Sequence, residues 1–174
     1  MDLQYPIGTF QWGGVITDEQ RRQLIDQIEQ APAQLRKAVA GLTQEQVDTP
    51  YRPGGWTVRQ VVHHLSDSHM NTYTRFRLAL TEDVPTIKPY DQERWAVLED
   101  ARTAPTELSL SLFESLHGRW VLLLRSLRAA DFARTFRHPE MGVVALDKYL
   151  GVVAWHGRHH IAHVTSLRDR MGWK

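Results

Sequence analysis

Nine histidines and no cysteine make imidazole the side chain of this protein best suited to metal or acid–base chemistry. Residues 155–163 read WHGRHHIAH and hold two overlapping pairs with a four-residue spacing, His156 with His160 and His159 with His163. Residues four apart lie on one face of a helix, so the two rings of either pair can point to a common spot. Neutral imidazole is the commonest metal ligand, and the spacing therefore predicts a metal site on the last helix.

A helical projection of residues 149–171 separates the two pairs. The apolar stripe of this segment is formed by Tyr149, Val153, Val164, Leu167 and Met171. His156 and His160 fall in the middle of the stripe. His163 lies at its margin, and His159 lies farther round. The projection therefore favours His156 and His160 as the pair that faces the protein interior.

A shared ion is one explanation for two buried histidines side by side. A buried imidazole without hydrogen-bond partners costs ~1–3 kcal/mol, and an ion bound between two rings removes that cost for both. The alternative is that each ring is a hydrogen-bonded core residue. A zinc protease is excluded, because Gly157 stands where those enzymes carry a general-base glutamate after the first histidine.

Candidates for a third ligand lie in residues 63–69, which read HHLSDSH. On the expected helix His69 shares the apolar face, His64 lies at its polar edge, and His63 and Asp67 face away. The pattern does not choose between His64 and His69, since His69 can equally be a core histidine bonded to a neighbouring helix. Asp67 is interpreted as solvated rather than as a carboxylate that orients His64.

Two other histidines are weaker candidates. His117 stands alone on an expected helix and is interpreted as structural. His138 precedes a proline in an expected loop and is interpreted as exposed.

Four amphipathic segments must position these side chains. Sequences typical of capping boxes open the first two, at Thr17 and Thr57. The expected helices run from 17 to 41, from 57 to about 80, from 105 to about 127, and from an Asp147 cap to about 171. Pro32 predicts a kink or break in the first helix. A short helix is expected at 92–98 and a hairpin or irregular loop at 133–145. Four such stripes are most simply buried in an all-α four-helix bundle.

Composition excludes several classes of protein. The length of 174 residues fits one domain, residues 1–174, with its own core. A net charge of +1, from 21 basic and 20 acidic residues, gives no excess for nucleic acid. The first ten residues do not form a signal peptide, and there is no apolar run of about 18 residues. We therefore expect a cytoplasmic protein with neither nucleic acid nor membrane as partner.

At these motifs the sequence resembles the DinB/YfiT superfamily, and within it the YfiT-like metal-dependent hydrolases of bacteria. The resemblance covers nearly the whole chain. It is carried by YPIG at 5–8, by TPYRPGGWTVRQVVHH at 49–64, by DSHMN at 67–71, by LHGRW at 116–120, and by WH and HHIAH within 155–163.

The resemblance implies an up-down-down-up four-helix bundle with one divalent metal ion held by three histidines. In the family the first ligand lies eight residues after the motif tryptophan, which here is Trp56, so the resemblance selects His64 over His69. The other two ligands are an HxxxH pair on the last helix, and the family pattern matches His156 and His160. Zinc is the favoured ion and nickel the alternative, because both suit three nitrogen ligands.

Three neutral histidines leave an open position on the ion, as in catalytic sites, where a bound water reaches a pKa of about 7. The resemblance therefore implies hydrolysis of a small-molecule substrate. Two alternatives stay open: a thiol S-transferase that uses a low-molecular-weight thiol, and a non-catalytic metal-binding module of a stress response. The sequence identifies no general base.

The first 16 residues contain one proline and three glycines and are apolar for an exposed tail. Their apolar side chains are Leu3, Tyr5, Ile7, Phe10 and Trp12. Such a segment usually packs on something, and members of the family are often dimeric. A homodimer is therefore expected.

Overall fold

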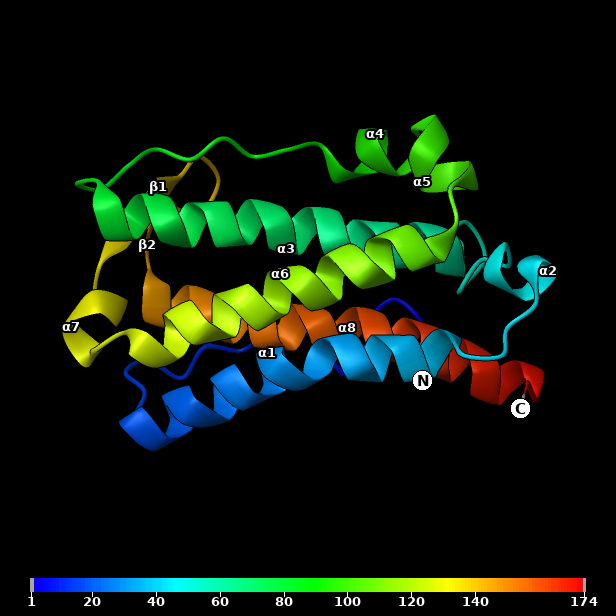
Figure 1. Ribbon diagram of the computed structural model, residues 1–174, viewed down its shortest axis with the longest axis horizontal. Helices are drawn as coiled ribbons and strands as arrows, with labels where there is room; N and C mark the ends of the chain where they lie inside the picture. Colours follow the sequence, from blue (N-terminus) through cyan, green and yellow to red (C-terminus); the bar gives the residue numbers. More distant parts are fainter. Residues whose placement is uncertain (1, 174) are drawn as a thin grey trace.

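The computed structural model of the protein describes residues 2–173, so Met1 and Lys174 of the predicted domain lie outside the described part. Four long helices dominate it, namely α1 (Asp18–Val39), α3 (Val58–Thr81), α6 (Thr106–Ser126) and α8 (Leu146–Met171). They lie side by side (Figure 1), with α1 and α8 running in one direction and α3 and α6 in the other. The predicted all-α, up-down-down-up bundle is confirmed. None of the described helices is long and apolar enough to cross a membrane.

One of the segments between the long helices is a crossover that runs back along the bundle. Because α3 and α6 run in the same direction, the chain must return along the bundle between them, and it does so through residues 82–105 (Figure 1). This crossover carries α4 (Gln92–Ala96), which matches the expected short helix, and α5 (Glu99–Thr103), which was not predicted. The remaining short helices are α2 (Gln44–Val47) and α7 (Ala129–Phe132).

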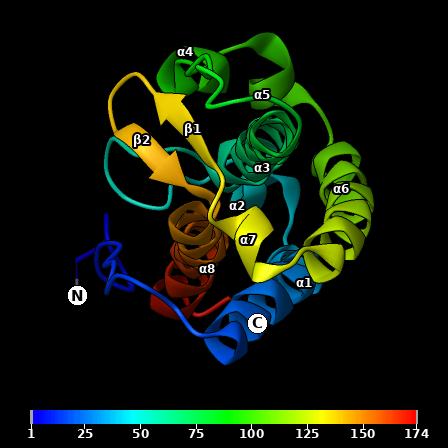
Figure 2. The ribbon, with the colours of Figure 1, turned by 90° about the vertical axis from the view of Figure 1, so that its left-hand side faces the viewer.

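The predicted hairpin is present between α7 and α8. It consists of β1 (Thr135–His138) and β2 (Gly142–Ala145), which pair antiparallel, with Phe136 opposite Val144. Seen from the end of the bundle (Figure 2), the hairpin lies beside α3 and α8. It is the minor strand component that the sequence predicted.

Capping chemistry explains where two of the long helices, α1 and α3, start. Thr17 and Thr57 each accept a hydrogen bond from the backbone N–H three residues on, and the glutamine at that position bonds back to the cap. The predicted cap of α8 is wrong: Ala145 is the cap residue, and Asp147 lies in the first turn. Asp147 instead accepts hydrogen bonds from Arg21 of α1, at 2.8 and 2.9 Å.

Pro32 does not break α1, which is continuous from Asp18 to Val39. Proline has no N–H, so the helical hydrogen bond that residue 32 would give to the carbonyl of Ile28 is missing. That carbonyl instead accepts a hydrogen bond from Nδ1 of His117, on α6, at 2.6 Å. Of the expected kink or break, the break does not occur, and the free carbonyl forms a bond between two helices.

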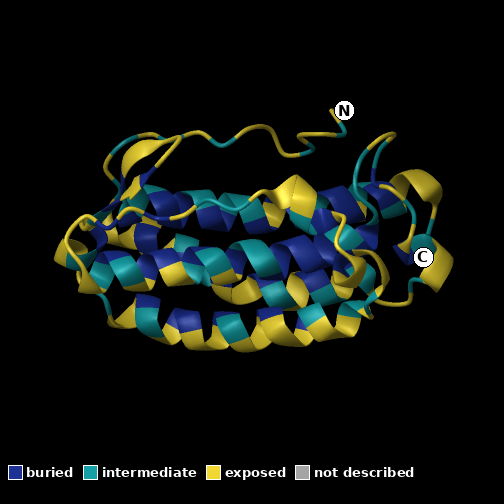
Figure 3. Cartoon of the chain, turned by 90° about the horizontal axis from the view of Figure 1, so that it is seen from above, coloured by how far each residue is buried: buried dark blue, intermediate teal, exposed yellow. Residues whose placement is uncertain are grey.

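A layer of histidines divides the core into two apolar clusters. One cluster includes Phe76, Trp120 and Tyr149, and the other includes Leu65 and Val164. Figure 3 shows the buried faces of the helices turned toward one another along the bundle. Between the two clusters lies what we call the histidine layer: His64, His69, His117, His156 and His160.

The N-terminal arm packs on α8 of its own chain (Figure 2). The indole N–H of Trp155 donates to the carbonyl of Gly8 at 3.2 Å. The rings of Phe10 and Trp12 lie so close to Gly151 that an added Cβ there would meet Trp12 at 3.3 Å. The apolar arm therefore finds a surface within one chain. The homodimer stays a prediction, without support from this segment.

The cap of α3 should contribute measurably to stability. Thr57→Ala removes the acceptor for the N–H of Gln60 and should lower the free energy of unfolding by about 1 kcal/mol. Thr74→Ala, at an exposed site inside the same helix, should change it by no more than about 0.5 kcal/mol. Urea denaturation followed by circular dichroism measures both, and equal effects would contradict the assignment of Thr57 as the cap.

Candidate metal centre

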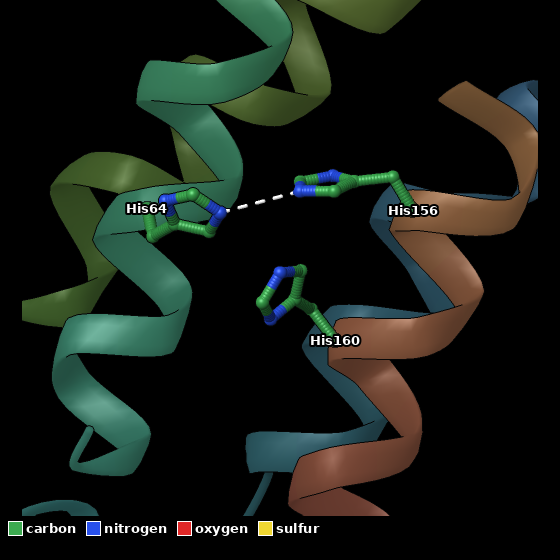
Figure 4. Close-up of side chains that lie close together, drawn as sticks. All are labelled: His64, His156 and His160. Atoms are coloured by element: carbon green, nitrogen blue, oxygen red, sulfur yellow. Dashed lines mark hydrogen bonds between the residues drawn. The ribbon is translucent and has the colours of Figure 1, made fainter. Parts of the chain in front are cut away.

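Three of the predicted residues come together in the middle of the bundle. His64 projects from α3 and His156 and His160 project from α8, and the rings turn a nitrogen toward a common space (Figure 4). One nitrogen from each ring lies within 4.8 Å of the other two. The Nε2 atoms of His64 and His156 are 3.2 Å apart. His64 and His160 are buried, and His156 is partly buried.

The size of this cluster fits a small divalent ion. Zinc–imidazole bonds are about 2.0–2.1 Å long, so two nitrogens at a tetrahedral ion are about 3.4 Å apart. The observed 3.2 Å between His64 and His156 is close to that value. The residues present therefore fit a metal ion with nitrogen ligands.

A chain of hydrogen bonds sets which nitrogen of His156 carries the proton. The carbonyl of Ile28 can only accept, so Nδ1 of His117 is the donor and its Nε2 is free to accept. Nδ1 of His69 lies 2.9 Å from that Nε2, and Nε2 of His69 lies 3.2 Å from Nδ1 of His156. With neutral rings, each Nδ1 donates to the next Nε2. His156 is left with an unprotonated Nε2 that faces His64.

A second chain of hydrogen bonds acts on His160 in the same way. The carbonyl of Gln4, in the N-terminal arm, lies 3.0 Å from Nε2 of His163, which must therefore be the donor. The Nδ1 atoms of His163 and His160 are 3.3 Å apart. Since Nδ1 of His163 is then unprotonated, His160 donates from Nδ1. Its Nε2 is unprotonated too.

His64 is the ring whose tautomer these contacts leave open. Its Nδ1 lies 3.5 Å from the hydroxyl of Tyr90, and its Nε2 faces the unprotonated Nε2 of His156. Trp56 covers the cluster, with ring centroids 4.6 Å from His64 and 6.2 Å from His160. Neither Tyr90 nor the Trp56 contact was predicted as part of the site. Tyr90 lies on the crossover and Trp56 just before α3, where helical periodicity places no side chain.

Burial keeps these rings neutral. It lowers the pKa of His64 to about 3 and that of His117 to about 4. Burial also holds the pKa values of His69, His156 and His160 well below the ordinary value of 6.5, and the nearby imidazoles add to the effect. Neutral rings are the form that can bind a metal.

The second HxxxH pair forms a cluster of its own with His160. One nitrogen each of His159, His160 and His163 lies within 4.8 Å of the others. In this cluster His163 is tied to Gln4, and the buried Nδ1 of His159 has no hydrogen-bond partner among the described residues. His159 stacks on Trp155, with centroids 4.5 Å apart. Spacing and proximity alone thus permit two sites that share His160.

Of the predictions for the other histidines, two are confirmed and two are wrong. His69 and His117 are core residues bonded to neighbouring helices, as anticipated. The prediction that His138 is exposed is wrong, because the hairpin folds back over α3 and leaves it 7% exposed. His63 was expected to face away from the core. It is buried under the crossover instead, 2.7 Å from Ser109 Oγ.

Asp67 is half-buried rather than freely solvated. Burial, with a smaller contribution from Asp100, raises its pKa to about 6. It forms no ion pair in the described part of the chain, and it does not orient His64, whose Nδ1 faces Tyr90.

Two cavities reach the centre from different sides and share His156 and Gln92 in their walls. The larger, of about 660 Å³, also contacts His69, Arg75 and Tyr90. The smaller, of about 260 Å³, also contacts Trp56, Glu93, His159, His160 and His163. A small molecule can therefore approach the histidines from either side.

The chain through His69 and His117 should be visible in the tautomer of His156. His117→Phe removes the acceptor for His69 and should release the tautomers of His69 and His156, at a cost of ~1–3 kcal/mol in stability. Long-range proton–nitrogen NMR spectra of the metal-free protein distinguish the two ring nitrogens. His63→Phe, a buried histidine outside the chain, is the matched control. An unchanged His156 spectrum in His117→Phe would refute the assignment.

Buried neutral histidines also predict a pH dependence of stability without metal. Burial lowers the pKa of His117 and of His159 to about 4, whereas histidines of the unfolded chain titrate near 6.5. The unfolded chain binds more protons below about pH 6.5, so stability is full above that pH and is lost as the pH falls toward 4. The raised pKa of Asp67 has the opposite effect, because this carboxyl binds its proton more tightly in the folded protein, but it is one group against several histidines. The midpoint of urea denaturation should fall as the pH is lowered from above about 6.5 toward 4. A midpoint that does not change with pH would contradict the argument.

Comparison with known proteins agrees with this architecture. The sequence model of the DinB superfamily matches residues 27–164. A protein of Bacillus mycoides (strain KBAB4) named "Putative metal-dependent hydrolase" is 56% identical over 172 residues, with 99% of each chain covered. A protein of Bacillus cereus (strain 03BB102) with the same name is 57% identical over 172 residues, again with 99% of each chain covered.

Solved structures also have this four-helix bundle. YfiT from Bacillus subtilis, described as "a probable metal-dependent hydrolase with an unusual four-helix bundle topology", is 51% identical and matches with a TM-score of 0.97 over 100% of both chains. TT2238, a four-helix bundle protein, shares the fold alone, at 19% identity and a TM-score of 0.57 over 81% of this chain and 94% of its own. The chain belongs to the DinB superfamily and has the four-helix bundle of YfiT.

Proposed function

We propose that this protein is a metal-dependent hydrolase whose divalent ion is held by His64, His156 and His160. The observation that carries the proposal is the convergence of the rings: the contacts around His156 and His160 leave each Nε2 unprotonated, and His64 Nε2 lies 3.2 Å from that of His156. Two unprotonated nitrogens that face a third, in a buried site, form a binding site for a cation.

The proposed ion would act as a Lewis acid and lower the pKa of a water molecule, so that hydroxide is available near neutral pH. Three protein ligands leave a position for water or substrate, as in catalytic rather than structural zinc sites. We favour zinc, with nickel as the alternative, because imidazole suits both. The names of the relatives from Bacillus mycoides and Bacillus cereus support the hydrolase class.

The residues of the chain itself would prepare the site. His69 and His117 hold His156 in the tautomer that can bind, and His163 does the same for His160. Among the described residues that line the smaller cavity, Glu93 is the only carboxylate, and the indole N–H of Trp56 donates to it at 3.1 Å. Glu93 is our candidate for a group that accepts a proton from the attacking water.

Metal content should separate the two overlapping histidine pairs. Each of His64→Ala, His156→Ala and His160→Ala should lose an ion that the unmodified protein holds at about one per chain, because each loses a ligand. His163→Ala should keep the ion with affinity weakened about 10- to 100-fold. His159→Ala should keep it unchanged. Elemental analysis after dialysis measures this, with circular dichroism to verify folding. Loss of metal in His159→Ala, with metal kept in His156→Ala, would place the ion in the other cluster.

Activity tests the class of reaction. The metal-loaded protein should hydrolyse members of a panel of small esters and amides, and His156→Ala should be inactive. The same panel with added low-molecular-weight thiols and electrophiles examines S-transfer, which differs only in the nucleophile. Turnover that requires a thiol would overturn hydrolysis in favour of transfer. Bound metal with no turnover in either panel would favour a binding module.

A further inference from the structure

Arg75 differs from the other buried arginines of the protein. Three arginines are at most 8% exposed, Arg21, Arg59 and Arg75. Arg21 pairs with Asp147 at 2.8 Å and Arg59 with Asp48 at 2.7 Å. Arg75 has no carboxylate partner among residues 2–173. Its one hydrogen bond there goes to the hydroxyl of Tyr149.

A guanidinium group has five N–H donors and is always charged. Burying such a group without a counter-charge is unfavourable, and one bond to a tyrosine hydroxyl neither neutralises the charge nor uses the remaining donors. Arg75 lies in the wall of the larger cavity. The unused N–H donors of Arg75 are therefore next to a cavity that is large enough for a small molecule.

The surroundings of Arg75 are suited to an anion. Thr72 and His138, both buried, and Ser68 line the same cavity and offer hydroxyl or imidazole groups. Burial lowers the pKa of His138, and the charge of Arg75 lowers it further, so the positive charge acts on this part of the cavity. The two carboxylates of the cavity wall, Asp91 and Glu140, are exposed residues and form no ion pair with Arg75.

The same cavity reaches the candidate metal centre. His156 lines it, and Tyr149, the partner of Arg75, precedes His156 by seven residues on α8. At 1.5 Å per residue, the two positions are about 10 Å apart along the helix. A molecule of moderate length can therefore contact Arg75 at one end and approach His156 at the other.

We propose that Arg75 is the anion-binding subsite of the larger cavity, and that the substrate carries a carboxylate or phosphate group at the end remote from the bond that reacts. Arginine suits both groups, because its planar fork can bind two oxygens at once. The inference rests on the proposed function only in that the cavity serves the metal centre. The anion site itself requires no metal.

The test measures anion binding to the metal-free protein, after the chelator has been dialysed away. Glutarate is the carboxylate probe, methylphosphonate is the phosphate probe, and glutaramide is the neutral control. One or both anions should bind saturably and shift the Nε–H resonance of Arg75 in proton–nitrogen spectra, whereas glutaramide should not. Comparison of the two anions decides which group the site prefers.

Variants assign the binding to this arginine. Arg75→Gln should weaken anion binding about 10- to 100-fold, and Arg75→Lys should be intermediate, because the charge remains but the fork is lost. Arg77→Gln is the matched control, since it removes the same charge from an exposed position on the same helix. It should bind as the unmodified protein does.

Two results would overturn the proposal: no saturable response to either anion in the unmodified protein, or unchanged binding in Arg75→Gln. The measurement on the unmodified protein stands even if Arg75→Gln does not fold. Metal content is measured separately. If the protein binds the anion but takes up no metal, the proposed function is rejected and the anion subsite is kept. If it takes up metal normally but does not bind either anion, the subsite is rejected and the proposed function is kept.

Discussion

The hydrogen bond from His117 to the carbonyl of Ile28 is the contact on which the proton positions of His117, His69 and His156 depend. It exists because Pro32 cannot donate to that carbonyl, which leaves a strong acceptor inside an otherwise regular helix. A carbonyl cannot donate, so the direction of every bond beyond it is set, through His117 and His69 to His156. One proline in α1 thereby influences a ring on α8.

This arrangement places polar groups where a bundle would otherwise be apolar. Five imidazoles separate two hydrophobic clusters, and each must be kept neutral and hydrogen-bonded or bound to an ion. Satisfied networks of this kind favour one arrangement of the helices over others, since any shift along the bundle axis would leave buried nitrogens without partners. The histidine layer therefore contributes both the ligands of the proposed metal site and the register of the four helices.

Access to the layer depends on the unusual direction of the helices. Because α3 and α6 run the same way, a long crossover must lie along the bundle, and it brings Tyr90 and Glu93 to the cavities. The N-terminal arm supplies Gln4, which lines the smaller cavity and accepts a hydrogen bond from His163. The bundle thus provides the rings, and the segments outside it provide the walls, the covering side chains and part of the hydrogen-bond network.

Much of this was determined by local features of the sequence. The capping boxes at Thr17 and Thr57 and the helical periodicity of apolar residues predicted the four helices, since both signals act within a few residues. The HxxxH spacing predicted that His156 and His160 share a helical face. The choice of His64 over His69 came from family resemblance, because helical periodicity placed His69 on the core face and His64 at its edge.

Only the tertiary structure decided which partners each ring meets. The sequence predicted the wrong cap for α8. It also predicted too much exposure for His63, His138 and Asp67, because segments distant in sequence cover these side chains. That Arg75 has no carboxylate partner among residues 2–173 could not be predicted either, since a helical position indicates burial but not whether a counter-charge is near. The effect of Pro32 also depends on the tertiary structure. Local sequence shows that a carbonyl of α1 loses its donor, and only the packing of α6 against α1 supplies His117 in its place.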